Sequence, residues 1–304
     1  MNLRHATLGC KNRISQSKNR CLTIIFLRME ETAKFQFRER SIGLRRGAPA
    51  IMGILNVTPD SFSDGGRFLE CGQAIEHAKR MIAEGAAVID IGGESTRPGF
   101  EPVPVQEEIR RVIPVIQGLR EFSELPISID TSKAAVAQAA LEAGADIVND
   151  VSALSDPAMA EVISRHHAGC IIMHSATLPQ DADAPLEVTN WLARRLMEVQ
   201  VLTRLPIEFF MADPGIGFGK NAIQNLAILH HLGELAASLP VTVLLAMSRK
   251  SFIGAVANAP SPAERLPGTI ATALLTCQNC HLLRVHDVGA VRQALEVAEA
   301  IQNS

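Results

Sequence analysis

Short apolar runs alternate with longer amphipathic segments from about residue 50 to the C-terminus. The short runs are rich in β-branched residues and are bounded by polar or glycine-containing stretches, which predicts buried strands. The longer segments carry apolar residues at helical spacing. We predict eight strands, over 50–57, 87–91, 127–130, 146–150, 170–174, 209–213, 241–247 and 283–286. The helices predicted between them include 72–84, 105–120, 133–143, 186–205, 221–237, 262–277 and 288–302.

This alternation predicts the fold class. Strands that alternate with helices imply right-handed βαβ crossovers and a parallel sheet, and eight such units close into a barrel. An open doubly wound sheet would need a glycine-rich phosphate turn after its first strand, whereas Thr58, Pro59, Asp60 and Ser61 follow Val57 here. We therefore predict an α/β protein with a single (β/α)8 TIM barrel over residues 35–304.

The N-terminal segment differs from the rest of the chain. Residues 1–29 contain basic but no acidic side chains, and their apolar stretch is short and lacks a small-residue cleavage site. We expect residues 1–34 to be a basic, disordered extension. Translation that starts at Met29 is an equally good interpretation of this segment.

Composition narrows the possible partners. The formal net charge is -3, so the Lys/Arg excess that carries phosphate-backbone affinity is missing, and we expect no nucleic acid partner. No run of about 18 apolar residues is present, so we expect no membrane span. The six cysteines are too dispersed for a disulfide framework, which favours reduced thiols and a cytoplasmic protein. Cys277, Cys280 and His281 have the spacing of a haem attachment site, but they end an apolar helix-like run, which favours packing.

Polar residues gather where the predicted strands end. One polar strand end alone is more often a helix cap or a satisfied buried group, but eight at equivalent places indicate a site, because barrel enzymes carry their chemistry at the C-terminal ends of the strands. The residues concerned are Asn56, Asp90, Asp130, Asn149, Asp150, His174, Asp213, Ser248, Arg249, Lys250, Arg284, His286 and Asp287.

This set mixes acids and amides with bases, which suits a polar heterocycle bound beside an anion. It suits metal-dependent hydrolysis less well, because no H-x-H or H-E-x-x-H spacing occurs. The segments 58–66 and 92–99 are rich in glycine and proline. Composition alone leaves open whether they close over a ligand or are simple turns.

Several strings are specific enough to indicate a family. They are MGILNVTPDSFSDGG (52–66), GGESTRPG (92–99), SIDTSK (128–133), ADIVNDVSAL (145–154), MH (173–174), DPGIGFGK (213–220), SRKSFIG (248–254) and RVHDV (284–288). In order and spacing they resemble dihydropteroate synthase, from about Ala50 to the C-terminus. The resemblance implies a transferase of folate biosynthesis. It would join 6-hydroxymethyl-7,8-dihydropterin pyrophosphate to p-aminobenzoate, yielding 7,8-dihydropteroate and pyrophosphate with help from Mg2+, and it would be a homodimer.

The resemblance also implies roles for individual residues. The pterin would be bound by Asp130, Asn149, Asp213, Lys250 and Arg284. Pyrophosphate would be bound by Asn56, Thr96, Arg97, Arg284 and His286, and Asn56 would also be a metal ligand. The p-aminobenzoate pocket would be formed by Phe62, Thr96, Arg97, Pro98, Phe218, Lys250 and Ser251. The catalytic set would be Asp130, Lys250, Arg284 and His286.

The chemistry agrees with these roles. Loss of pyrophosphate from the pterin methylene leaves a cation, so catalysis needs stabilisation of the leaving group more than a strong base. The neutral aniline nitrogen then attacks because it is held in position. Water would capture the same cation, and closure of the segments around Phe62 and Pro98 is the expected means of excluding it.

The chain departs from the family pattern at a few positions. Ser175 and Ala176 follow His174 where a longer polar motif is common, which leaves the role of the fifth-strand loop open. Smaller departures are Ala153, Leu154 and Ala246, at positions where glycine is usual. A sulfonamide-insensitive replacement enzyme, a pterin-binding methyltransferase domain and a non-catalytic paralogue remain alternatives. The uninterrupted DPGIGFGK and SRKSFIG strings favour sulfonamide sensitivity.

Overall fold

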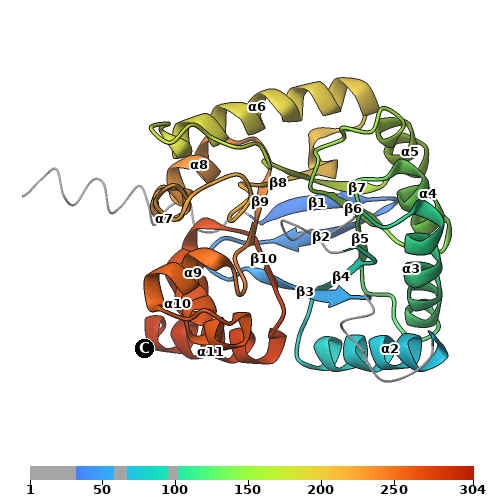
Figure 1. Ribbon diagram of the computed structural model, residues 1–304, viewed down its shortest axis with the longest axis horizontal. Coiled ribbons are helices and arrows are strands. Elements are labelled where there is room, and N and C mark those ends of the chain that lie inside the picture. The colour runs from blue at the N-terminus through green and yellow to red at the C-terminus, as the bar shows by residue number, and fades with distance from the viewer. Residues whose placement is uncertain (1–31, 58–66, 95–101) are drawn as a thin grey trace, which may run out of the picture.

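The computed structural model describes residues 32–57, 67–94 and 102–304, and within them a closed barrel of parallel strands is surrounded by helices (Figure 1). The strands follow one another around the barrel in chain order, and the last pairs with the first, with Leu282 opposite Ala50. They are β3 (Ala50–Asn56), β4 (Val88–Gly92), β5 (Ile127–Asp130), β6 (Ile147–Asp150), β7 (Gly169–Met173), β8 (Phe210–Asp213), β9 (Thr242–Ala246) and β10 (Leu282–Val285). The predicted (β/α)8 barrel is confirmed.

Helices cover the outside of the barrel (Figure 1). They are α2 (Arg67–Ala83), α3 (Val105–Arg120), α4 (Ala134–Glu142), α5 (Met159–His166), α6 (Ala184–Thr203), α7 (Ala222–His230), α8 (Leu232–Ser238), α9 (Ser251–Ala257), α10 (Leu266–Thr276) and α11 (Val288–Gln302). Side chains such as Ile89 and Ile91 point outward from the strands into the apolar layer beneath the helices. Because both faces of the strands are covered, strands such as β4 and β7 are buried along their whole length, as in other parallel sheets.

The helices differ in part from the predicted segments. The single helix predicted over 221–237 is two helices, because the backbone of His231 leaves the helical region between α7 and α8. The segment predicted as a helix over 262–277 begins as a 3-10 turn, Pro262–Arg265, that continues into α10. The short helices α5 and α9 were not among the predicted segments. Among the described residues, no helix has the length and apolar character needed to cross a membrane.

A hairpin that the sequence pattern did not reveal closes the N-terminal end of the barrel. Its strands are β1 (Ala33–Phe37) and β2 (Arg40–Leu44), which pair antiparallel. Phe35, Phe37 and Leu44 are almost fully buried in one apolar cluster with residues from inside the barrel. The hairpin thus forms a floor for the barrel interior. Residues 1–31 lie outside the described residues, so disorder there stays a prediction. The predicted boundary at residue 34 is wrong, because Ala33 and Lys34 already belong to β1.

Candidate active site

The barrel interior has two layers, and strand geometry separates them. Residues two apart on a strand point to the same side of the sheet. Val88, Ile147, Met211 and Leu282 belong to the apolar cluster above the hairpin floor. The residues two positions further along the same strands are Asp90, Asn149, Asp213 and Arg284. Each strand therefore lifts one polar side chain above the apolar layer, toward the C-terminal mouth of the barrel.

Arg284 lies at the centre of this polar layer. Its Nε is 2.6 Å from Oδ2 of Asp90, and its Nη2 is 2.6 Å from Oδ2 of Asp130. The side-chain amide of Asn149 donates to the same Asp90 oxygen at 3.1 Å. Four strands, β4, β5, β6 and β10, thus contribute to one network of charge-assisted hydrogen bonds.

Burial shifts the protonation equilibria in this network. Desolvation raises the pKa of Asp130 to about 7, although Arg284 opposes the rise. Burial alone would lower the pKa of Arg284, but Asp90 and Asp130 hold it above its ordinary value, so this guanidinium stays charged. Oδ1 of Asp90 and Oδ1 of Asp130 have no hydrogen-bond partner among the described residues. Buried acceptors of this kind are available to a ligand.

Lys250 and Asp213 form the second charged group of the site. Burial lowers the pKa of Lys250 to about 7, and Asp213 partly offsets this effect. The ammonium donates a hydrogen bond to the carbonyl oxygen of Ile216 and lies 4.2 Å from the ring centroid of Phe218. Burial also raises the pKa of Asp213, whose Oδ1 accepts from the backbone N–H of Gly215 at 2.7 Å. Phe218 and Lys250 are therefore brought together, as predicted for one pocket.

Two pairs of polar side chains join the ends of β9 and β10. Nδ1 of His286 lies 3.0 Å from Oγ of Ser248. The Arg249 guanidinium binds Asp287 through two contacts, Nε to Oδ2 at 2.9 Å and Nη2 to Oδ1 at 2.5 Å. These contacts tie the strand end that carries Lys250 to the strand end that carries His286.

Asn56 and Ser251 stand at the edge of this group. Asn56 is the last residue of β3 and is paired with Gly92 of β4. Ser251 is exposed and begins α9, directly after Lys250. A cavity of about 290 Å³ opens beside the site, with Asp130 and Phe218 among its lining residues. No group of three or more His, Cys, Asp or Glu side chains in the described part of the chain could hold a metal ion.

Comparisons with known proteins agree with this geometry. A family model described as "Pterin binding enzyme" matches residues 52–286. A dihydropteroate synthase from Synechocystis sp. is 46% identical over 260 residues, covering 83% of this chain and 89% of that protein. One from Bacillus subtilis is 45% identical over 255 residues, covering 83% and 88%. This chain belongs to the dihydropteroate synthase family.

Solved structures of dihydropteroate synthases have the same fold. The Xanthomonas albilineans enzyme with 4-aminobenzoic acid matches with a TM-score of 0.83 at 42% identity, covering 89% of this chain and 99% of that chain. The same enzyme in complex with 7,8-dihydropteroate matches with a TM-score of 0.81 at 40% identity, covering 89% and 99%. The similarity therefore extends over nearly the whole barrel.

Several residues that the dihydropteroate synthase resemblance singled out cannot be placed. Phe62, Thr96, Arg97 and Pro98 lie outside the described residues. The remaining predicted site residues stand at the C-terminal ends of strands, in the loops that follow them or, for Ser251, at the start of α9: Asn56, Asp130, Asn149, Asp213, Phe218, Lys250, Ser251, Arg284 and His286. The structure directly connects Asp130 with Arg284, and Phe218 with Lys250. It does not show a direct contact between these two pairs.

Sequence reasoning gave no role to some residues that organise this dihydropteroate synthase site. Asp90 was noted as a polar strand end, yet it accepts from both Arg284 and Asn149. Lys133 was noted only as part of a string. Its ammonium binds Glu94 at 2.7 Å and buried Glu108 at 2.6 Å. The signal for Asp90 was present, since an acid that ends an apolar strand needs a buried partner.

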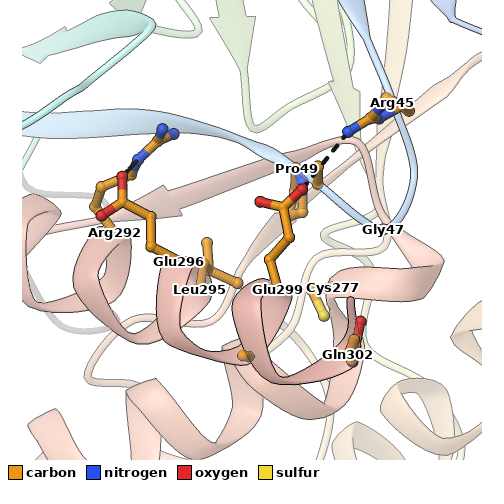
Figure 2. Close-up of a pocket in the computed structure, with 11 residues that line it drawn as sticks. Arg45, Gly47, Pro49, Cys277, Arg292, Leu295, Glu296, Glu299 and Gln302 are labelled. Carbon is orange, nitrogen blue, oxygen red and sulfur yellow. Dashed lines mark hydrogen bonds and ion pairs between the residues drawn. The ribbon is translucent and has the colours of Figure 1, made fainter. Parts of the chain in front are cut away.

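A second pocket lies at the other end of the barrel, between the β2–β3 connection and α11 (Figure 2). Its charged side chains already pair with one another. Arg292 binds Glu296 at 2.7 Å, and Arg45 lies 3.9 Å from Glu299. Figure 2 shows Arg292, Glu296 and Glu299 on α11, with Arg45 reaching toward Glu299 from the β2–β3 connection. Two carboxylate oxygens without a partner among the described residues, Oδ1 of Asp90 and Oδ1 of Asp130, lie instead at the C-terminal mouth, together with the shifted pKa values of Asp130 and Lys250, and we place the active site there.

Proposed function

We propose that this chain joins 6-hydroxymethyl-7,8-dihydropterin pyrophosphate to p-aminobenzoate and releases 7,8-dihydropteroate and pyrophosphate. The observation that carries the proposal is the Arg284 guanidinium, shared between Asp90 and Asp130 within a layer of amide, carboxyl and ammonium groups. Such a layer offers donors and acceptors to the edge of a flat heterocycle and a cation to an anionic leaving group. The reaction itself is inferred from membership of the dihydropteroate synthase family.

The pterin is held by Asp130, Asn149, Asp213 and Lys250. Asp130 has a pKa of about 7, so near neutral pH its carboxyl can present a proton to a ring acceptor or accept one from a ring donor. Asp213 lies near the Lys250 ammonium, and this pair offers both a negative and a positive group to the ring. As positive charge develops on the pterin, the two carboxyl groups favour it electrostatically.

The pyrophosphate is held by Arg284, His286 and Asn56, and the family resemblance assigns the same role to Thr96 and Arg97. Arg284 carries a permanent charge, and Ser248 orients the His286 ring. Mg2+ is usually bound through one or two protein oxygens together with substrate phosphates. The side-chain oxygen of Asn56, the last residue of β3, would be the protein ligand of such an ion. When bound, the ion supplies neutralisation of the leaving group's charge.

The p-aminobenzoate is held next to Lys250. Phe218 and Ser251 line its pocket, and the family resemblance assigns p-aminobenzoate binding to Phe62, Thr96, Arg97 and Pro98 as well, which lie outside the described residues. The aniline nitrogen attacks as a neutral nucleophile, so the chain's contribution is to hold it in line with the pterin methylene. Water must be excluded from the cation, a role that the same resemblance assigns to the segments around Phe62 and Pro98.

The test is the release of pyrophosphate by the purified protein with Mg2+ and the pterin pyrophosphate, with and without p-aminobenzoate. We expect release that depends on p-aminobenzoate, forms dihydropteroate and stops when a chelator removes Mg2+. Lys250→Met should reduce pterin affinity at least about tenfold, whereas Lys79→Met on the exposed face of α2 should change nothing. Normal pterin binding without any turnover would instead indicate a binding paralogue or a methyltransferase domain.

The proposal extends to assembly and drug response. We expect a cytoplasmic homodimer whose contact involves α10 and α11, because Leu275, Val297 and Ile301 expose apolar side chains there. Light scattering of the wild type and of Leu275→Glu tests this contact. We also expect sulfonamides to inhibit turnover in competition with p-aminobenzoate; undiminished turnover in excess drug would identify a sulfonamide-insensitive enzyme.

A further inference from the structure

The loop between β8 and α7, residues 213–220, is pressed against the chain that follows β7. Gly215 and Gly219 have left-handed backbone angles, with φ of +69° and +60°. A Cβ atom at Gly215 would overlap the carbonyl oxygen of His174, and one at Gly219 would overlap that of Ala176. Glycine is therefore required at both positions, and the loop brings backbone carbonyls close together.

The Lys220 ammonium lies between three backbone carbonyl groups of this region. Its Nζ donates to the carbonyl oxygens of His174 at 3.0 Å, Gly215 at 3.0 Å and Phe218 at 2.9 Å. An ammonium has three N–H donors, so its donor capacity is used entirely on main-chain oxygens. Burial lowers the pKa of Lys220 to about 8, and Asp213 offsets part of this effect. The arrangement is a small carbonyl cage whose cation belongs to the chain itself.

The same loop holds Lys250. The carbonyl oxygen of Ile216 accepts from its ammonium, and the Phe218 ring packs 4.2 Å from it. Gly217 leaves room for the Lys250 side chain, because a Cβ atom there would approach Cδ of Lys250 to 2.8 Å. Without a cation, the carbonyls of His174, Gly215 and Phe218 would repel one another, and the loop that carries these Lys250 contacts would open.

We propose that Lys220 is a positioning residue, whose ammonium acts as a built-in cation that closes the 213–220 loop around the Lys250 side chain. The inference rests on the proposed function, because the assigned role of Lys250 and Phe218 is to hold the two substrates. It assigns Lys220 no contact with either substrate. Its effect on turnover passes through the loop.

The test uses the full-length protein with Lys220→Ala, which leaves the cage without its cation. We expect kcat/KM to fall about 10²-fold, as misplacement of a binding group does, with a higher KM for both substrates. The side chain removed beyond Cβ has the length of n-propylammonium. Adding n-propylammonium should restore kcat/KM at least about tenfold, and K+ should restore part of it because carbonyl cages also bind K+. Tetramethylammonium has no N–H donor and should restore nothing.

Lys220→Met is the matched variant. Its side chain fills the same space without a charge, so we expect the same loss and no recovery with any of these cations. It also guards against a folding defect in Lys220→Ala, because its packing is retained. Lys79→Met, which removes an exposed lysine from α2, should match the wild type with and without each salt.

A spectroscopic readout separates this inference from the function itself. Trp191 is the single tryptophan of the chain, and its ring stands edge-on to the His174 ring, with centroids 4.9 Å apart. The backbone carbonyl of His174 is one wall of the cage. We therefore expect the Trp191 emission to change in Lys220→Ala and to return to that of the wild type with n-propylammonium, without any substrate present.

Each outcome decides the proposal. Wild-type kinetics in Lys220→Met, or a Lys220→Ala protein that is folded but not restored by n-propylammonium, would overturn it. A protein that shows the Trp191 response but never makes dihydropteroate would support the carbonyl cage while refuting the proposed reaction.

Discussion

At the N-terminal end of the barrel the Arg120 guanidinium is directed at the carbonyl oxygens of Gly144, Ser123 and Leu125 and at the Asp146 carboxylate. At the C-terminal end Asp90 and Asp130 each keep one carboxylate oxygen that no described residue satisfies. Both ends bury charge, but only the C-terminal network leaves acceptors free. The comparison indicates that the N-terminal network contributes stability, whereas the C-terminal network is prepared for a ligand at some cost in stability.

The surroundings of the two networks agree with this division. Arg38 of the hairpin donates to the carbonyl oxygens of Leu141 at 2.5 Å and Ala145 at 2.6 Å. Its guanidinium also lies 3.5 Å from the Asp146 carboxylate. These contacts connect the hairpin floor to α4 and to the chain that leads into β6. The mouth of the barrel has no such cover among the described residues. Its acid Asp130 and its lysine Lys250 both have pKa values of about 7. Perturbed pairs of this kind are typical of functional sites.

The largest expected effect is on catalysis at the C-terminal end. Asp130→Asn keeps the shape of the side chain but removes its negative charge and its ability to gain or lose a proton. We expect turnover to fall about 10²- to 10³-fold, because a group that stabilises the developing charge is lost, while the free energy of unfolding stays within about 1 kcal/mol. Steady-state pyrophosphate release and urea unfolding measure the two effects.

The exposed residue Asp181 provides the control for that variant, since Asp181→Asn should leave both turnover and unfolding unchanged. A large loss of stability in Asp130→Asn, with normal turnover of the folded fraction, would show that this end of the barrel serves stability after all.

A smaller effect, on stability and not on catalysis, is expected at the N-terminal end. Arg120→Met leaves the buried Asp146 carboxylate with a weaker set of partners, so we expect the free energy of unfolding to fall by about 3 kcal/mol. The kcat/KM of the folded protein should not change. Urea unfolding and turnover below the unfolding transition are the measurements.

The matched control for Arg120→Met is Arg110→Met on the same helix, where the arginine is exposed and pairs with Glu107 three residues away. Surface pairs contribute little, so its cost should stay within about 0.5 kcal/mol. Equal losses in the two variants would contradict the role assigned to the Arg120 network.

The smallest expected effect is the dependence of stability on pH. The pKa of Asp130 is raised to about 7 in the folded protein, above its unfolded value of about 4. Between these values the folded state holds more protons, so its stability falls as pH rises from about 4 to about 7. The wild type should therefore lose at least about 1 kcal/mol relative to Asp130→Asn between pH 5 and pH 8. Urea unfolding at several pH values gives this difference; parallel curves for the two proteins would rule out the raised pKa.

Strand positions and the polar mouth could be predicted because both depend on local pattern. An apolar strand such as β4 is visible from its own residues, and the acid that ends it marks the mouth of the barrel. The hairpin could not be predicted in this way. Its Phe35 and Phe37 alternate over only one short strand, and their burial depends on a barrel end that exists only after all eight strands have closed.

The partners of the site residues were also invisible in the sequence. Arg284 binds Asp90 across 194 positions, and no local pattern could pair them. Lys220 looked like the end of a glycine-rich string, because its role depends on where three backbone carbonyls converge. The roles assigned to Asp130, Asn149, Asp213, Lys250, Arg284 and His286 came from resemblance to a family, because no local pattern distinguishes a ligand-binding strand end from a helix cap.

The contact between Arg284 and Asp90 has a consequence for biosynthesis. Arg284 is on the last strand and Asp90 is on the second, so the network that we assign to the active site forms only when β10 closes against β3. A nascent chain on the ribosome can form most of its helices and strands while this network is still missing. Enzymatic competence therefore arises at the final step of assembly, and a truncated chain that lacks β10 has neither a closed barrel nor this charged network.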